Sequence, residues 1–196
     1  MNLEIGPGEH PAAGFDVRVD VLALPGVDVV CRMDRLPFAA GAFGALRANH
    51  VLEHQSYELV GETVAEWVRV LAEGASLDIG VPDARCRAAS WLAGEIDTAE
   101  ANYWILGGHS DRPAHRGVDR GGVPRWIWNA HHTLFDPASL HDLLAGCGLS
   151  DVAVGPEDVC NLRASARKPG AGRRRAEAGG GPVRPPAGGG TPPGPR

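Results

Sequence analysis

Three side chains that can transfer protons or bind a metal lie close together in the first third of the chain. His50, Glu53 and His54 are spaced i, i+3 and i+4, so they share one face if a helix begins there. An imidazole titrates near neutral pH, and His50 could therefore act as a general base toward a substrate hydroxyl. The trio could instead hold a divalent metal, or it could cap the helix and order the site. We favour the capping role for Glu53 and His54, and we expect no metal site.

A second group of polar side chains lies between residues 84 and 135, where apolar periodicity is poor. It comprises His109, Asp111, His115, Asp119, His131 and His132. Metal binding is one interpretation, but the spacing matches no strong ligand motif. We interpret the segment as an irregular substrate lid with a polar lining. Its aromatic residues could stack on a ring or a sugar, or they could form a small satellite core; they are Trp91, Tyr103, Trp104, Trp126 and Trp128.

The elements that must position these residues follow from short apolar runs and turn residues. Strands are expected at residues 2–5, 17–21, 27–31, 45–49 and 76–81, with a closing pair at 152–154 and 159–165. Apolar residues recur at helical spacing from Leu59 to Leu71, which predicts an amphipathic helix that ends near Gly74. Asp136 and Pro137 predict the start of a second helix, with Asp136 as N-cap and Pro137 at the first helical position.

This alternation of strands and helices predicts an α/β fold. We expect a Rossmann-like, doubly wound, mostly parallel sheet with an antiparallel last strand. Ligands bind such sheets at the carboxyl ends of the strands. The loop at residues 6–8, Asp20, residues 31–34, Asn49 and His50 would all lie on that edge.

Several motifs occur in a fixed order. They are LEIGPG at residues 3–8, Asp20 at the end of the next strand, LPF at 36–38, ANHVLEH at 48–54, EWVRVL at 66–71, VPD at 81–83 and HTLF at 132–135. This set resembles the class I S-adenosylmethionine (SAM) dependent methyltransferases over about residues 2–168. The stretch from HVLEH to RVL resembles their compact methyltransferase-11-like branch.

The resemblance implies methyl transfer from SAM to an O, N or C nucleophile of a small molecule. The implied cofactor-binding residues are Glu4, Gly6, Gly8, Asp20, Met33 and Asn49. The glycines would let the backbone approach the methionyl part of SAM, and Asp20 would accept both ribose hydroxyls. Backbone groups near Met33 would hold the adenine. His50 would lie beside the methyl group as the catalytic base.

Two other functions compete with this one. The first is a catalytically weak or inactive binding or scaffold protein on the same fold, which Arg32, Gly44 and Ala75 favour because they depart from the family pattern. The second is a Rossmann-like enzyme that uses NAD. It is disfavoured because the sequence Gly-Pro-Gly lacks a third glycine at the required spacing.

Composition limits the remaining possibilities. Residues 1–168 are expected to form one methyltransferase domain, and residues 169–196 contain nine Gly and seven Pro, which predicts a disordered tail. The net charge is −5 although that tail carries five of the arginines, so the acidic domain argues against nucleic acid as a partner. Four cysteines without a CxxC pair suggest a reduced, cytoplasmic chain. We expect no signal peptide and no membrane-spanning segment.

Overall fold

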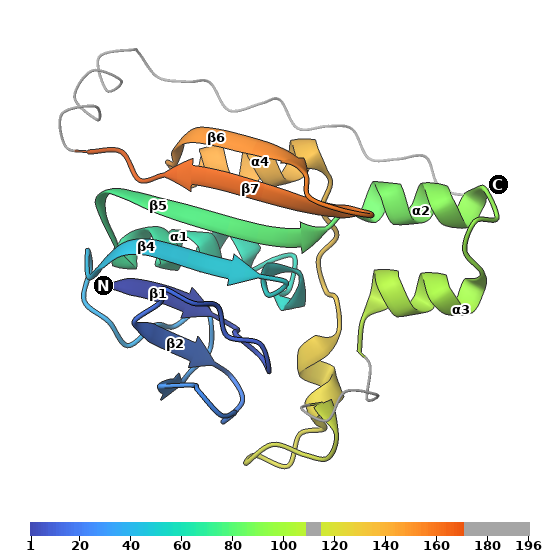
Figure 1. Cartoon of the computed structure of the whole chain (residues 1–196), viewed down its shortest axis with the longest axis horizontal. Helices are drawn as coiled ribbons and strands as arrows, with labels where there is room; N and C mark the ends of the chain where they lie inside the picture. Colours follow the sequence, from blue (N-terminus) through green and yellow to red (C-terminus); the bar gives the residue numbers. More distant parts are fainter. Residues whose placement is uncertain (109–114, 171–196) are drawn as a thin grey trace.

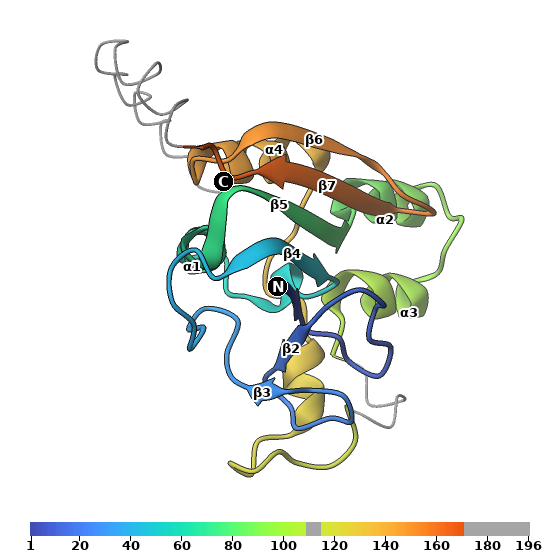
Figure 2. The same cartoon turned by 60° about the vertical axis from the view of Figure 1, so that its left-hand side comes forward.

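Within the part of the chain that the structure describes, a single mixed sheet of seven strands organises the protein (Figure 1). The computed structural model describes residues 1–108 and 115–170. The strands are β1 (Asn2–Ile5), β2 (Val17–Asp20), β3 (Val29–Val30), β4 (Phe43–Asn49), β5 (Leu71–Pro82), β6 (Ser150–Pro156) and β7 (Asn161–Arg167). Their order is β3-β2-β1-β4-β5-β7-β6, and Figure 2 shows the sheet from β6 at one edge to β3 at the other.

The sheet confirms the predicted fold class. Strands β1 to β5 are parallel, and β7 runs antiparallel to both of its neighbours, β5 and β6. The strand order reverses between β1 and β4, which is the switch point at which doubly wound sheets bind ligands.

Two helices cover one face of the sheet and form the core with it. Helices α1 (Val60–Val70) and α4 (Pro137–Gly146) both lie behind the strands in Figure 1. Trp67 of α1 and Leu140 of α4 are fully buried in the same apolar cluster as Leu3 and Leu46 of the strands. Asp136 accepts a hydrogen bond from the backbone N–H of Ser139, so the predicted cap of α4 is present.

The opposite face of the sheet carries a row of alternating charges. Glu4 of β1 lies between Arg18 of β2 and Arg47 of β4, and Arg47 lies beside Asp78 of β5. The guanidinium of Arg163 on β7 donates to Asp78 at 2.8 and 3.1 Å and so continues the row. Cross-strand neighbours of opposite sign stabilise a sheet. This face is therefore stabilised by polar contacts, whereas the other face is stabilised by apolar packing.

The first helix ends earlier than predicted. Helix α1 stops at Val70, and Leu71 already begins β5, where it pairs with Phe43 of β4. Gly74, the expected C-cap, has a φ of +74° inside β5 and donates its N–H to the carbonyl oxygen of Lys168. Leu71 is fully buried in the apolar core, so the chain leaves the helix here without exposing an apolar side chain.

The expectation that residues 84–135 are irregular is wrong in part. The segment contains α2 (Ala84–Leu92), α3 (Thr98–Ala101), a π-helical turn η2 (Asn102–Leu106) and a 3-10 turn η4 (Arg125–Asn129). No residue of α2 is buried, so this helix has no apolar face that periodicity could reveal. Asp83 caps it by accepting from the N–H of Cys86.

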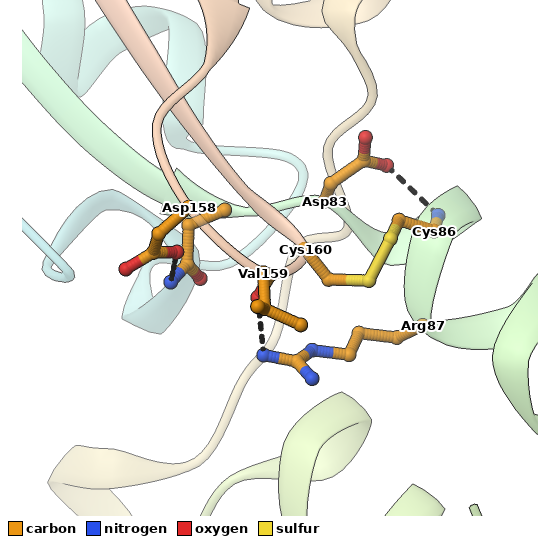
Figure 3. Close-up of a disulfide and its surroundings, with 7 residues drawn as sticks. Asp83, Cys86, Arg87, Asp158, Val159 and Cys160 are labelled. Atoms are coloured by element: carbon orange, nitrogen blue, oxygen red, sulfur yellow. Dashed lines mark hydrogen bonds between the residues drawn. A yellow bond between two sulfur atoms is a disulfide. The ribbon is translucent and has the colours of Figure 1, made fainter. Parts of the chain in front are cut away.

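The interpretation of the cysteines as reduced is wrong for two of them. Cys86 of α2 and Cys160 form a disulfide, shown in Figure 3, with Cα atoms 5.3 Å apart. The two residues are 74 positions apart in sequence, so their pairing depends on the tertiary fold. Cys31 and Cys147 are free. Since disulfides are rare in the cytosol, the cysteines no longer support a cytoplasmic location.

Part of the chain lies outside the described residues. This applies to His109 and Asp111 of the polar group and to all of the predicted tail except residues 169 and 170. Among the helices of the described ranges, none combines the length and the apolar character needed to cross a bilayer.

Candidate functional site

A cavity of about 650 Å³ opens at the carboxyl ends of the parallel strands. In Figure 1 the arrowheads of β1, β4 and β5 point to the side of the sheet on which α2 and α3 lie. Its lining includes every residue predicted for the site: Glu4, Gly6, Gly8, Asp20, Met33, Asn49 and His50. Small-molecule sites have volumes of roughly 300–1,000 Å³, so the cavity can hold a nucleoside-sized ligand.

The loop after β1 needs glycine for two reasons. Gly6 and Gly8 have φ angles of +62° and +55°, a region that other residues rarely adopt. In addition, a Cβ at Gly6 would clash with the side chain of Val51. The N–H of Gly6 donates to the carbonyl oxygen of Val19 at 2.8 Å, which ties the loop to β2.

The carboxylate of Asp20 connects this loop with the end of β2. One oxygen accepts from the N–H of Leu22 at 2.9 Å, and the other accepts from the N–H of Gly8 at 3.4 Å. Burial raises the pKa of Asp20, and the backbone hydrogen bonds oppose that shift. Asp20 therefore already orders the loop, and its carboxylate also lines the cavity.

Glu4 is buried rather than exposed to solvent at the strand end. Only 4% of its surface is accessible. Both carboxylate oxygens accept from the N–H of Ala12, at 3.1 and 3.0 Å, and Arg18 lies 3.4 Å away as an ion-pair partner. The residue thus fixes the course of the loop at residues 6–12 while it borders the cavity.

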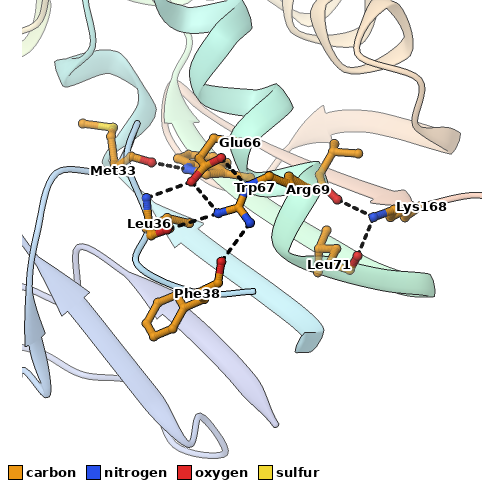
Figure 4. A network of polar contacts seen from close by, with 9 residues as sticks. Met33, Leu36, Phe38, Glu66, Trp67, Arg69, Leu71 and Lys168 are labelled. Atoms are coloured by element: carbon orange, nitrogen blue, oxygen red, sulfur yellow. Dashed lines mark hydrogen bonds and ion pairs between the residues drawn. The ribbon is translucent and has the colours of Figure 1, made fainter. Parts of the chain in front are cut away.

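A network centred on α1 holds the LPF loop (Figure 4). Arg69 donates to the carbonyl oxygens of Phe38 at 2.8 Å and Leu36 at 3.1 Å. Glu66 accepts from Arg69 at 2.6 Å and from the N–H of Leu36 at 2.9 Å. The hydrogen bond from Arg69 lowers the pKa of Glu66. The EWVRVL motif therefore fastens the LPF loop, which follows the cavity-lining residues 31–34.

Arg32 and Met33 line the cavity just before this loop. The indole N–H of Trp67 donates to the carbonyl oxygen of Met33 at 2.9 Å. Arg32 forms a two-point ion pair with Asp34, with both nitrogen–oxygen distances at 2.9 Å. Asp34 thus balances the charge of Arg32.

The residues after β4 adopt a strained conformation. His50 has a φ of +53°, and its N–H donates to the carbonyl oxygen of Gly80 at 2.9 Å. A Cβ at Gly80 would meet the amide oxygen of Asn49, so a larger residue there would require the Asn49 side chain to move. Strain in a non-glycine residue often marks a functional position.

His50 is oriented by a buried carboxylate. Its Nδ1 atom lies 3.3 Å from Oε1 of Glu53, while 40% of its side chain remains accessible from the cavity side. The hydrogen bond with Glu53 raises the pKa of His50, and burial opposes that shift. With Nδ1 engaged by the carboxylate, Nε2 is the atom that can face a ligand.

Glu53 and His54 do not cap a helix as expected. They belong to η1 (Leu52–His54), a single 3-10 turn without a side-chain cap, and His50 precedes it. Glu53 contacts His50, and Nδ1 of His54 lies 3.1 Å from the carbonyl oxygen of Ala130. One ligand atom of Glu53, one of His54 and one of His131 lie within 4.8 Å of one another. Sequence spacing could not reveal His131, because it comes from the far end of the lid segment.

Another wall of the cavity comes from the described residues of 84–135, called the lid segment after the role expected for it. Arg87, Tyr103, Trp104, Trp128 and His132 line it. Arg87 donates to the carbonyl oxygen of Val159 at 2.8 Å (Figure 3), and its guanidinium lies 4.5 Å from the ring centre of Trp104. The disulfide anchors the same helix to the start of β7. Trp91 and Trp126 are absent from the lining and are partly exposed, so the aromatic group is divided between two environments.

Comparison with known proteins identifies the fold. No protein-family profile matches the sequence, and neither does any curated protein sequence. Solved structures do match. A SAM-dependent methyltransferase from Thermotoga maritima, described as a possible histamine N-methyltransferase, has a TM-score of 0.56 at 17% identity over 85% of this chain and 81% of its own. The fold is that of the SAM-dependent methyltransferases.

Two further structures show the same methyltransferase fold. A SAM-dependent methyltransferase from Methanosarcina mazei has a TM-score of 0.56 at 16% identity, over 86% of this chain and 92% of its own. The 1,6-didemethyltoxoflavin-N1-methyltransferase of Burkholderia thailandensis has a TM-score of 0.54 at 18% identity, over 86% of this chain and 70% of its own. The latter structure contains bound 1,6-didemethyltoxoflavin and S-adenosylhomocysteine.

Proposed function

We propose that this protein transfers a methyl group from SAM to a small-molecule acceptor bound in the cavity. The observation that carries the proposal is the convergence of all seven predicted site residues on one cavity at the switch point of a methyltransferase fold. Gly6, Gly8 and Glu4 would surround the methionyl part of SAM, Asp20 would bind the ribose, and the backbone near Met33, with Asn49, would complete the cofactor site.

His50 is the proposed catalytic base. It lies beyond β4 at the sheet edge, borders the cavity and is oriented by Glu53 through Nδ1. Methyl transfer is an in-line displacement at a sulfonium, so the protein must align the acceptor and remove its proton. The residues of the lid segment, among them Trp104 and Trp128, would contact the acceptor.

Calorimetric titration with SAM, S-adenosylhomocysteine and NAD tests the cofactor. Binding of SAM and S-adenosylhomocysteine but not of NAD supports the proposal. The absence of heat and of a thermal shift with both SAM and S-adenosylhomocysteine would refute it. Incubation with methyl-labelled SAM and a panel of hydroxyl, amine and carbon acids then tests transfer. Tight SAM binding without transfer to any acceptor would favour the alternative of a binding or scaffold protein.

A further inference from the structure

We propose that Glu53, His54 and His131 form a binding site for a divalent transition-metal ion of the Zn²⁺ type at the junction between the sheet and the lid segment. Two imidazole nitrogens and one carboxylate oxygen are a donor set that Zn²⁺, Co²⁺ and Fe²⁺ share. The site is separate from the SAM contacts proposed above, and it uses His131 in place of His50.

The geometry of the three side chains fits such an ion. Their ligand atoms lie within 4.8 Å of one another, and the two imidazole rings are adjacent, with centres 5.2 Å apart. Bonds to Zn²⁺ are about 2.0–2.1 Å long, so the donors of a tetrahedral site are separated by roughly 3.4 Å. Side-chain movements of about 1 Å would therefore close the group around an ion.

A buried oxygen atom supplies an independent indication. Oε2 of Glu53 is buried and has no hydrogen-bond partner in the described part of the chain, whereas Oε1 contacts His50. Glu53 is only 1% exposed. An unpartnered carboxylate oxygen is costly in such a place, and a cation would satisfy it.

Both imidazoles are already oriented as metal ligands are. Nδ1 of His54 lies 3.1 Å from the carbonyl oxygen of Ala130, and Nδ1 of His131 lies 3.2 Å from that of Ile105. Each Nδ1 must carry the hydrogen to make this contact, so the lone pair of each neutral ring is on Nε2. Metal-binding histidines usually donate their other N–H to a carbonyl in this way.

The backbone also holds the ligands in place. The N–H groups of His132 and Thr133 both donate to the carbonyl oxygen of Glu53, at 2.8 and 3.2 Å, and the N–H of His131 donates to that of Leu106 at 2.7 Å. All three ligand residues border the cavity, so an ion there keeps coordination positions open toward it. The ion would fasten the lid segment to η1 and would offer a Lewis acid to an acceptor oxygen.

Titration of the EDTA-treated full-length protein with Co²⁺ tests the site. We expect one Co²⁺ per chain, visible d–d absorption bands, displacement by Zn²⁺ and a rise in melting temperature. His131→Ala and Glu53→Gln should weaken Co²⁺ binding by at least ~10-fold. The matched control is His132→Ala, whose side chain is next in sequence but outside the cluster, and it should bind like the wild type.

The outcomes separate this proposal from the proposed function. Unchanged Co²⁺ affinity in folded His131→Ala, an equal loss in His132→Ala, or no binding by the wild type would overturn the metal site. A thiolate-to-cobalt charge-transfer band would assign the ion to Cys31 or Cys147 and would also overturn it. SAM titration of the same EDTA-treated protein is read separately, so its failure would count against the methyltransferase proposal alone.

Discussion

The indole nitrogen of Trp67 donates to the carbonyl oxygen of Met33 at 2.9 Å and thereby joins a fully buried core residue to a wall of the cavity. Trp67→Phe removes this donor and also leaves a small cavity, because the indole is fully buried. We expect a loss of about 2–3 kcal/mol in the free energy of unfolding from the lost donor and the cavity together, and weaker SAM binding, because the loop around Met33 loses a fixed point. Urea unfolding and SAM titration measure the two effects. Trp91→Phe, at a partly exposed site on α2, should change neither.

The ion pair between Glu66 and Arg69 makes the free energy of unfolding depend on pH in the acid range. The pKa of Glu66 is lowered below its usual value of 4.5, so the native state binds fewer protons than the unfolded state there. The stabilisation is complete above about pH 4.5 and is lost as the pH falls through the lower native pKa. Glu66→Gln should cost roughly 1.5 kcal/mol at neutral pH and flatten this acid-side loss. Urea unfolding between pH 3 and 7 measures both, and Glu62→Gln, exposed on the same helix, should retain the wild-type profile.

Asp20 has two tasks that separate variants can distinguish. Asp20→Asn retains an acceptor for the N–H of Leu22 but lacks the negative charge proposed to bind the ribose. We expect its affinity for SAM to fall by at least ~1 kcal/mol, about fivefold, with little change in melting temperature. Asp20→Ala should lower both. Asp28→Asn, outside the cavity, is the control, and wild-type affinity in Asp20→Asn would restrict Asp20 to ordering the loop.

His50→Ala separates catalysis from cofactor binding. Loss of a general base typically slows a reaction by about 10²–10⁴-fold, whereas SAM affinity should change little. Single-turnover transfer from labelled SAM and calorimetric titration give the two quantities once an acceptor is found. His141→Ala, an exposed histidine of α4, should leave both unchanged. Equal losses of turnover and affinity would make His50 a cofactor-binding or structural residue.

Features that depend only on residues close together in the sequence were predictable from it. Strand β1 and the loop at residues 6–8 follow from an apolar run and glycines, and the start of α4 follows from Asp136 and Pro137. The antiparallel last strand follows from the pattern of a family with this fold. In each case a period, a cap or a turn residue acts within a few positions, so the signal is local. Helix α2 lacked such a signal because it buries no side chain.

Only the tertiary structure decided which distant residues meet. The disulfide joins residues 74 positions apart, and His54 contacts the backbone of Ala130 across 76. The sequence placed His50, Glu53 and His54 together as one group, but in the fold Glu53 has two sets of neighbours: it orients His50 through Oε1, and one of its oxygens also lies within 4.8 Å of ligand atoms of His54 and His131. Periodicity encodes which face of an element is buried. The partner of a buried polar atom is set by how the lid segment packs against the sheet. Spacing along the chain does not reveal which distant residues this packing brings together.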